Sequence, residues 1–283
     1  MRFGNLLIIA LTQYCLAGFL SEEKLSVTLL DKNLALVCLS TMLIAAAGYI
    51  INDYLDVKID EVNKPDRVLV GNSISRKFAI LLHVSLNLIA IALVITVSRT
   101  IAVIELGTAL LLVKYSSTYK RKLLIGNIIV ALFCGLSLFV VWLWKPELSL
   151  LHVMAYTLFA FITTLSREII KDMEDMKGDR MADCRTLPLV FGIKQTKKVL
   201  FIISSLLVTA SIIYFYELMK SQHIHDLLKP VFAAYLAIAL ILPFFLLIYQ
   251  VNQANTTSDF ARLSRLNKLI MLSGILTLVF FGE

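Results

Sequence analysis

Apolar residues follow one another in long runs along the whole chain, and short charged segments separate the runs. Each run is about 17–22 residues long, which is the length that a helix needs to cross the hydrocarbon core of a membrane. The pattern therefore predicts an all-α polytopic membrane protein in which residues 1–283 form a single membrane domain. We expect nine transmembrane helices around a central cavity, at residues 3–20, 33–52, 77–97, 100–116, 123–142, 149–169, 197–216, 230–250 and 266–281.

The composition excludes several other classes of protein. Hydrophobic residues make up 59% of the chain and charged residues 17%, whereas a soluble domain is roughly 45–50% apolar. The net charge of +7 does not indicate nucleic-acid binding, because the basic residues are scattered among short connections. The four cysteines are far apart, so neither a zinc site nor a disulfide framework is predicted. No protein partner is indicated.

The distribution of Lys and Arg predicts the orientation in the membrane. If the N-terminus is cytoplasmic, one side holds only six of the 27 basic residues, namely Lys24, Lys32, Arg99, Lys145, Lys220 and Lys229. Cytoplasmic segments of membrane proteins carry an excess of Lys and Arg. We therefore expect a multi-pass protein of the cell (plasma or inner) membrane. Its two long charged segments, 53–76 and 170–196, are expected to be cytoplasmic loops that form a lid over a pocket.

Two groups of aspartates with the same spacing end two of the apolar runs. Asp53, Asp56 and Asp60 are three and then four residues apart, and so are Asp172, Asp175 and Asp179. On a helix this spacing places three carboxylates on one face, where they repel one another unless a cation lies between them. Mg²⁺ prefers oxygen ligands and is held by one or two carboxylates together with substrate phosphates. We predict catalytic roles for all six aspartates, and metal ligation by Asp53, Asp56, Asp172, Asp175 and Asp179.

The two groups also mark a weak internal repeat. In both halves an apolar run leads into the aspartates, and a basic stretch, a glycine and a new apolar run follow. Two pseudo-repeated halves that face each other would bring both groups together at one end of a cavity.

Nearby cations would stabilise a departing diphosphate and leave an allylic carbocation, which needs an apolar and dry pocket. The candidate cations are Lys58, Lys64, Arg67, Lys114, Lys120, Arg121, Arg167 and Lys171.

Simpler interpretations compete with this one. Acidic residues at helix ends are often only solvated caps. A calcium EF-hand fails, because Leu55 and Val57 stand where oxygen ligands are required. Glu105 is an unpaired carboxylate inside the fourth predicted span, close enough to its outer end for the side chain to reach the interface. A cation-coupled membrane transporter would also use intramembrane acids, but it predicts charges near mid-membrane.

The motifs resemble the UbiA superfamily of intramembrane prenyltransferases over nearly the whole chain. The signature N-D-x-x-D-x-x-x-D is present from Asn52 to Asp60, and the second aspartate motif from Asp172 to Asp179. Asn5 matches an Asn of the first helix, and the segment from Tyr115 to Lys120, followed by Gly126 and Asn127, is similar to the family's middle Tyr/Lys segment. The resemblance implies Mg²⁺-dependent transfer of a prenyl group from a prenyl diphosphate. It also implies substrate-binding roles for Asn5, Asn52, Lys58, Arg67, Tyr115, Lys120, Arg167 and Lys171.

The acceptor is suggested by the segments that follow the two motifs. The stretches 63–75 and 167–188 are most similar to the geranylgeranylglyceryl-phosphate geranylgeranyltransferase branch, which implies a lipid-phosphate acceptor. The chain departs from that branch at Val68, where Pro is usual, and at Asp183 and Cys184, where Gly is common. The alternative is an aromatic-acceptor polyprenyltransferase of quinone biosynthesis, which acts on 4-hydroxybenzoate or a similar acid.

Overall fold

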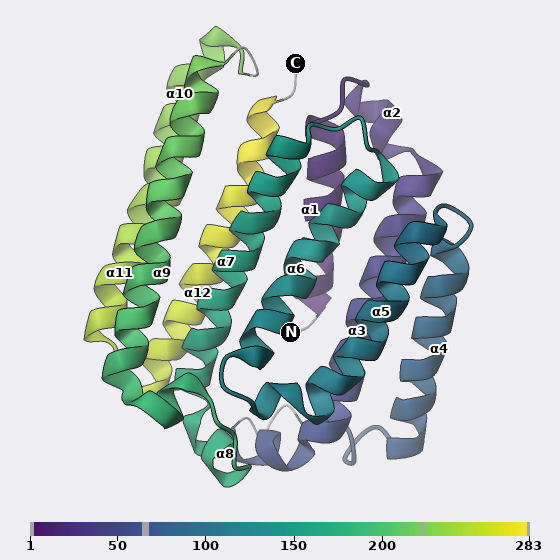
Figure 1. Cartoon of the computed structure of the whole chain (residues 1–283), viewed down its shortest axis with the longest axis vertical. Coiled ribbons are helices and arrows are strands. Elements are labelled where there is room, and N and C mark those ends of the chain that lie inside the picture. The colour runs from purple at the N-terminus through teal and green to yellow at the C-terminus, as the bar shows by residue number, and fades with distance from the viewer. Residues whose placement is uncertain (1–2, 64–67, 222–223, 282–283) are drawn as a thin grey trace.

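The computed structural model describes residues 3–63, 68–221 and 224–281, which form a bundle of long helices (Figure 1). Within these ranges the only β interaction is an isolated bridge between Val70 and Ile74. The elements in chain order are α1 Phe3–Phe19, α2 Leu25–Leu29, α3 Lys32–Asn63, α4 Arg76–Val94, α5 Arg99–Ser117, η2 Tyr119–Arg121, α6 Ile125–Trp144, α7 Leu150–Glu174, α8 Met176–Met181, α9 Leu187–Lys220, η3 Asp226–Leu228, α10 Lys229–Tyr235, η4 Leu236–Ile241, α11 Leu242–Gln253, α12 Thr257–Leu276 and η5 Thr277–Phe281.

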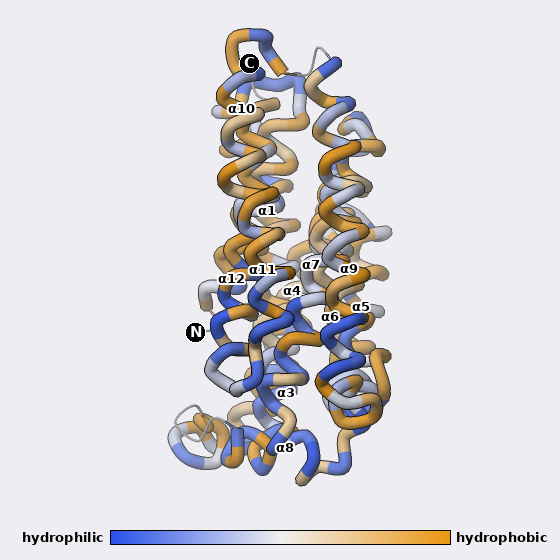
Figure 2. Tube along the Cα trace, turned by 90° about the vertical axis from the view of Figure 1, so that its left-hand side faces the viewer, coloured by the Kyte–Doolittle hydropathy of each residue, from blue (hydrophilic) through white to orange (hydrophobic). Residues whose placement is uncertain are grey.

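The membrane-spanning character of the chain follows from these helices. Eight helical segments of the described residues are long and apolar enough to cross a membrane, and α1 is a shorter apolar helix of 17 residues. The protein is therefore an all-α, multi-pass membrane protein, as predicted. The count of nine crossings, the central cavity and the two repeated halves stay predictions. Figure 2 shows many hydrophilic residues toward the end of the bundle that carries α8.

The two long loops expected from the sequence are mostly helical, so this prediction is wrong. Helix α3 continues ten residues beyond Asp53 to Asn63, and α4 begins at Arg76, where Ser75 caps it by accepting a hydrogen bond from the Phe78 amide (3.2 Å). The second segment contains the end of α7, the short α8 and the start of α9. The apolar run shows where a span leaves the hydrocarbon, but the helix continues beyond that point because residues 53–63 contain no Gly or Pro to break it.

Helix α7 occupies the centre of the packing. One apolar cluster joins it to α9, α11 and α12, and a second cluster joins it to α1 and α6. The contact with α12 depends on Gly274, because a Cβ atom there would lie 2.3 Å from the Phe159 ring. In a membrane such a contact stabilises the helix pair through close van der Waals packing, which small residues such as glycine allow. The C-terminal end of α7, which carries the second aspartate group, is thereby held on two sides.

Glu105 does not reach the membrane interface, contrary to the expectation from its position in the span. Its side chain is buried in the bundle, and its Oε1 atom accepts hydrogen bonds from Ser40 (2.9 Å) and Thr41 (3.0 Å) of α3. Thr41 in turn accepts from Gln13 of α1 (3.2 Å), which also donates to the Ser137 carbonyl of α6 (2.6 Å). The Glu105 carboxyl group is therefore part of a polar network that fixes α1, α3, α5 and α6 relative to one another.

We expect Glu105→Gln to keep or raise the midpoint of thermal unfolding in detergent. The amide oxygen still accepts from Ser40 and Thr41, and no carboxylate has to be desolvated. Glu105→Leu, which removes the acceptor, serves as the comparison and should lose about 1 kcal/mol. A midpoint for Glu105→Gln as low as that of Glu105→Leu would show that the carboxylate charge itself is needed.

Candidate active site

The first aspartate group lies on the last turns of α3, at the end of the bundle that carries α8 (Figure 1). Asp53, Asp56 and Asp60 share one face of this helix, as their spacing predicts. Asp56 is buried, while Asp53 and Asp60 are half-buried. Asn52, before the group, is also half-buried, whereas Lys58 is exposed. The structure thus places the three carboxylates on one face of α3 and leaves Lys58 at the surface.

Lys120 forms an ion pair with the buried Asp56. It belongs to η2 in the connection between α5 and α6, just beyond Tyr115, which is half-buried on α5. The start of α6 comes very close to this turn, since a Cβ atom at Gly126 would lie 2.7 Å from the Lys120 Cα atom. Only glycine leaves room for this approach, so Gly126 allows the ammonium group to reach Asp56.

The second aspartate group crosses the junction between two helices. Asp172 lies in the last turn of α7, Asp175 terminates that helix, and Asp179 lies in α8. The expectation that all three share a face of one continuous helix is therefore wrong for this group. The break at Asp175 relieves the crowding of three like charges on one helix. Asp172 accepts a hydrogen bond from the Asn127 side chain (2.9 Å) and lies within electrostatic range of Asp179.

Direct contacts hold the two groups at the same end of the bundle. The Gly178 amide of α8 donates to the side-chain oxygen of Asn63 (2.9 Å), at the end of α3. A Cβ atom at Gly178 would lie 2.4 Å from this side chain, so a larger residue would separate α8 from α3. The Arg185 amide donates to the Arg121 carbonyl (2.9 Å), which ties the start of α9 to η2. Between these ties lies Cys184, whose thiol pKa is raised by burial and by the nearby Asp179 carboxylate.

A group of cations lies along α7 and α12. The Glu168 carboxylate binds both Arg167 (3.2 Å) and Lys171 (3.0 Å). Lys268 of α12 lies close enough to Arg167 for the two positive charges to repel each other. Its ammonium group donates a hydrogen bond to the Asn5 side-chain oxygen (2.6 Å). Asn5 donates in turn to the Tyr49 hydroxyl of α3 (3.3 Å).

Lys268 and Glu168 were not among the predicted site residues. The signal for Lys268 was a charged residue inside an apolar span, and such residues in membrane helices usually have a function. The only sequence signal for Glu168 is its position close to Arg167 and Lys171. The predicted residue Arg67, with Lys64, lies outside the described residues.

The carboxylates fit a hard divalent cation by their chemistry. Within residues 3–63, 68–221 and 224–281, no three His, Cys, Asp or Glu side chains are arranged as a complete metal site. Mg²⁺ does not require one, because it commonly takes one or two carboxylates and completes its shell with water and substrate phosphate oxygens. The oxygen-only donors of the two aspartate groups match this preference, and Lys120 already pairs a positive charge with Asp56 of the first group.

Asp183 has a backbone conformation that explains one departure from the related branch. Its φ angle is +52°, in the left-handed region, which glycine adopts most easily and which Asp tolerates better than most residues. The turn between α8 and α9 is therefore the same kind of turn that glycine would make there.

Comparison with known proteins gives the family of this chain. The UbiA prenyltransferase family matches residues 10–269. The chain belongs to this family. It is therefore an enzyme that transfers prenyl groups, and the transporter alternative is wrong. A digeranylgeranylglyceryl phosphate synthase of Saccharolobus solfataricus is 38% identical over 200 residues, which are 70% of this chain and 70% of the relative.

Solved structures have the same fold. A structure described as a digeranylgeranylglyceryl phosphate synthase in membranes superimposes with a TM-score of 0.70 at 23% identity, covering 98% of this chain and 93% of the other. A UbiA homologue from Archaeoglobus fulgidus bound to GPP and Mg²⁺ gives a TM-score of 0.65 at 16% identity, covering 97% of both chains. At these identities the likeness establishes the UbiA fold.

Proposed function

We propose that this UbiA-family enzyme transfers a geranylgeranyl group from its diphosphate to geranylgeranylglyceryl phosphate with the help of Mg²⁺. The observation that supports the proposal is that both aspartate groups lie at one end of a membrane bundle, where the Gly178–Asn63 hydrogen bond joins their helices and Lys120 is paired with Asp56. The choice of acceptor is supported by the name of the Saccharolobus solfataricus relative, and the choice of metal by the Archaeoglobus fulgidus homologue bound to GPP and Mg²⁺.

We assign the diphosphate and metal to the aspartate end of the bundle. Asp53, Asp56, Asp172, Asp175 and Asp179 would hold Mg²⁺, and Asp60 and Asn52 would support them. Bound Mg²⁺ supplies charge that stabilises the leaving diphosphate. Asn127 orients Asp172 for this task by donating a hydrogen bond to it.

Lys120 has a second role in this mechanism. When the diphosphate binds, the Lys120 ammonium group leaves the Asp56 carboxylate and pairs with a phosphate oxygen. Asp56 then becomes available as a metal ligand. The allylic C–O bond then breaks and its electron pair leaves with the diphosphate, so that an allylic carbocation remains on the prenyl chain. The acceptor hydroxyl oxygen bonds to this carbon, and its proton passes to an aspartate of the first group.

The cations of α7 and α12 would bind the phosphate of the acceptor. Arg167, Lys171 and Lys268 carry three positive charges, and Glu168 balances one of them. The Arg167 Nε atom is buried and has no hydrogen-bond acceptor within the described part of the chain. A buried donor beside excess positive charge favours an anion at this position.

The proposed orientation places this end on the cytoplasmic side of the cell membrane. It rests on the excess of Lys and Arg in the segments at this end. The polar substrates would then arrive from the cytoplasm, while both prenyl chains remain in the bilayer.

We expect Asp56→Asn and Asp175→Asn each to reduce prenyl transfer by at least about 100-fold, because each removes a ligand for the metal and its diphosphate. Chelation of divalent metal should reduce the wild-type rate similarly. Glu217→Gln, at an exposed position on α9, is the matched control and should keep full activity. Because Asp56 is also in a buried ion pair, the thermal midpoint of each variant must be measured. A folded Asp175→Asn protein with normal turnover would contradict the metal assignment.

The acceptor is tested with labelled geranylgeranyl diphosphate, Mg²⁺ and purified protein. Geranylgeranylglyceryl phosphate and 4-hydroxybenzoate are offered in separate reactions. A metal-dependent di-ether product is expected from the first acceptor only. Product from 4-hydroxybenzoate alone would support the aromatic alternative, and product from neither would contradict the proposed substrates.

Lys268→Gln should raise the KM for the acceptor about tenfold and change the KM for the diphosphate less than twofold. The reason is that the variant removes a charge from the proposed acceptor-phosphate site and leaves the aspartate groups intact. Arg265→Gln, exposed one turn earlier on α12, is the control. A larger change in the KM for the diphosphate than in the KM for the acceptor would assign Lys268 to the site that binds the diphosphate.

A further inference from the structure

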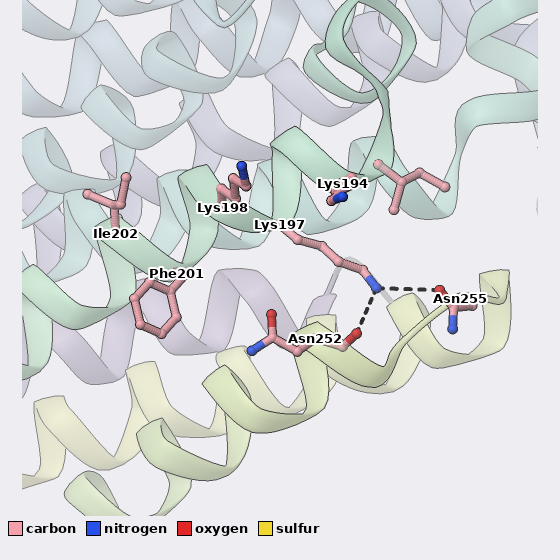
Figure 3. Close-up of a pocket in the computed structure, with 8 residues that line it drawn as sticks. Lys194, Lys197, Lys198, Phe201, Ile202, Asn252 and Asn255 are labelled. Atoms are coloured by element: carbon pink, nitrogen blue, oxygen red, sulfur yellow. Dashed lines mark hydrogen bonds between the residues drawn. The ribbon is translucent and has the colours of Figure 1, made fainter.

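A basic pocket lies between α9 and the connection from α11 to α12 (Figure 3). Its volume is about 710 Å³, within the range of typical small-molecule sites. None of its lining residues belongs to the aspartate groups or to the cations of α7 and α12. They are Ile193, Lys194, Lys197, Lys198, Phe201, Ile202, Asn252 and Asn255.

The pocket has excess positive charge. Lys197 crosses it and donates to the Asn252 carbonyl (3.0 Å) and the Asn255 side chain (3.4 Å) (Figure 3). Lys194 and Lys198 are exposed. Within the part of the chain that the structure describes, no acidic residue lines the pocket, and none of the three lysines has an ion pair. The nearest acid in sequence, Asp259, is already bonded to Arg262 (2.7 Å) and to the backbone at the start of α12.

Five of the six α9 residues that line the pocket, all except Ile193, form a stripe with a polar and an apolar end. Residues 194, 197, 198, 201 and 202 follow the i, i+3, i+4, i+7, i+8 pattern of a single helix face. The three lysines come first, in the turns that follow the kink at Gly192 (φ +81°). Phe201 and Ile202 come next and are 49% and 57% exposed, at the start of the apolar length of α9.

This order matches the cross-section of a lipid monolayer. In a membrane the ammonium groups lie at the level of the headgroups, and the two exposed apolar side chains one to two turns deeper face the acyl chains. A soluble phosphate would bind the lysines, but it has no apolar part that could contact Phe201 and Ile202. The combination therefore favours an anionic lipid over a free anion.

We propose that this pocket binds the headgroup of an anionic glycerophospholipid from the surrounding bilayer. Lys194 and Lys198 contact its phosphate, the side chains of Asn252 and Asn255 bind headgroup hydroxyls, and an acyl chain lies along Phe201 and Ile202. The bound lipid joins α9 to the connection between α11 and α12, so it raises the stability of the folded protein by mass action. The proposal does not depend on the reaction that the enzyme catalyses.

The test measures lipid binding to the purified full-length protein in neutral detergent, by native mass spectrometry and by the midpoint of thermal unfolding. The probes are dioleoyl phosphatidylglycerol, dioleoyl phosphatidylcholine and glycerol 3-phosphate. We expect phosphatidylglycerol to bind and to raise the midpoint, and each of the other two to bind at least about tenfold more weakly. Equal binding of phosphatidylcholine would overturn the proposal, and equal binding of glycerol 3-phosphate would make the pocket a site for a soluble phosphate.

Charge variants locate the binding to this pocket. The triple variant Lys194→Gln, Lys197→Gln, Lys198→Gln should weaken phosphatidylglycerol binding about tenfold or more, and the corresponding triple change to Arg should retain it. The double variant Lys194→Gln, Lys198→Gln leaves the Lys197 hydrogen bonds intact and should still lose most of the phosphatidylglycerol binding. It tests the proposal even if the triple variant does not fold.

The control removes three exposed basic residues from other elements at the same end of the bundle, as Lys77→Gln, Lys122→Gln, Arg265→Gln. It should bind phosphatidylglycerol as the wild type does. An equal loss in this control would show that the lipid responds only to total charge and would overturn the proposal.

Discussion

Repulsion among clustered carboxylates is the constraint on which the active end of this protein depends. Asp56 is paired with Lys120, and the two side chains are only 11% and 10% exposed. Removing one partner of a buried pair costs several kcal/mol, because the other charge stays buried without compensation. The turn that carries Lys120 leads directly into Gly126, which permits the close approach, and Asn127, which donates to Asp172. The connection between α5 and α6 and the first turn of α6 therefore contact one aspartate group each.

The two ends of the bundle use polar residues differently. At the far end, Lys145 binds Glu23 (2.6 Å), His152 is joined to the Tyr214 hydroxyl (2.9 Å), and Tyr156 to the Thr277 hydroxyl (2.6 Å). These contacts fasten helix ends to one another. At the aspartate end the cations of α7 and α12 exceed their acidic partners, which suits anionic substrates. In the proposed mechanism this excess charge is balanced only when diphosphate and acceptor phosphate are bound.

Sequence periodicity predicted the class of fold and the identity of the chemical groups, but it misplaced the ends of the helices that carry these groups. The end of the apolar run predicts that the helix ends near residue 52, whereas α3 continues through all three aspartates of the first group. The opposite error occurred in the second group, where a single helix was expected and the chain breaks at Asp175. Glu105 shows a third limit, since its partners Ser40 and Thr41 are more than 60 residues away in sequence.

The sequence by itself determined that the chain crosses a membrane, because runs of apolar residues cannot be covered by so few charged ones. It also determined the family, because two aspartate motifs and the Tyr/Lys segment stand at specific spacings. Only the tertiary structure decided which groups meet. Lys120 with Asp56, Asn127 with Asp172, and Lys268 with Asn5 are contacts between different helices. They depend on how closely those helices approach, and glycines such as Gly126 and Gly178 set that distance through the packing of the whole bundle.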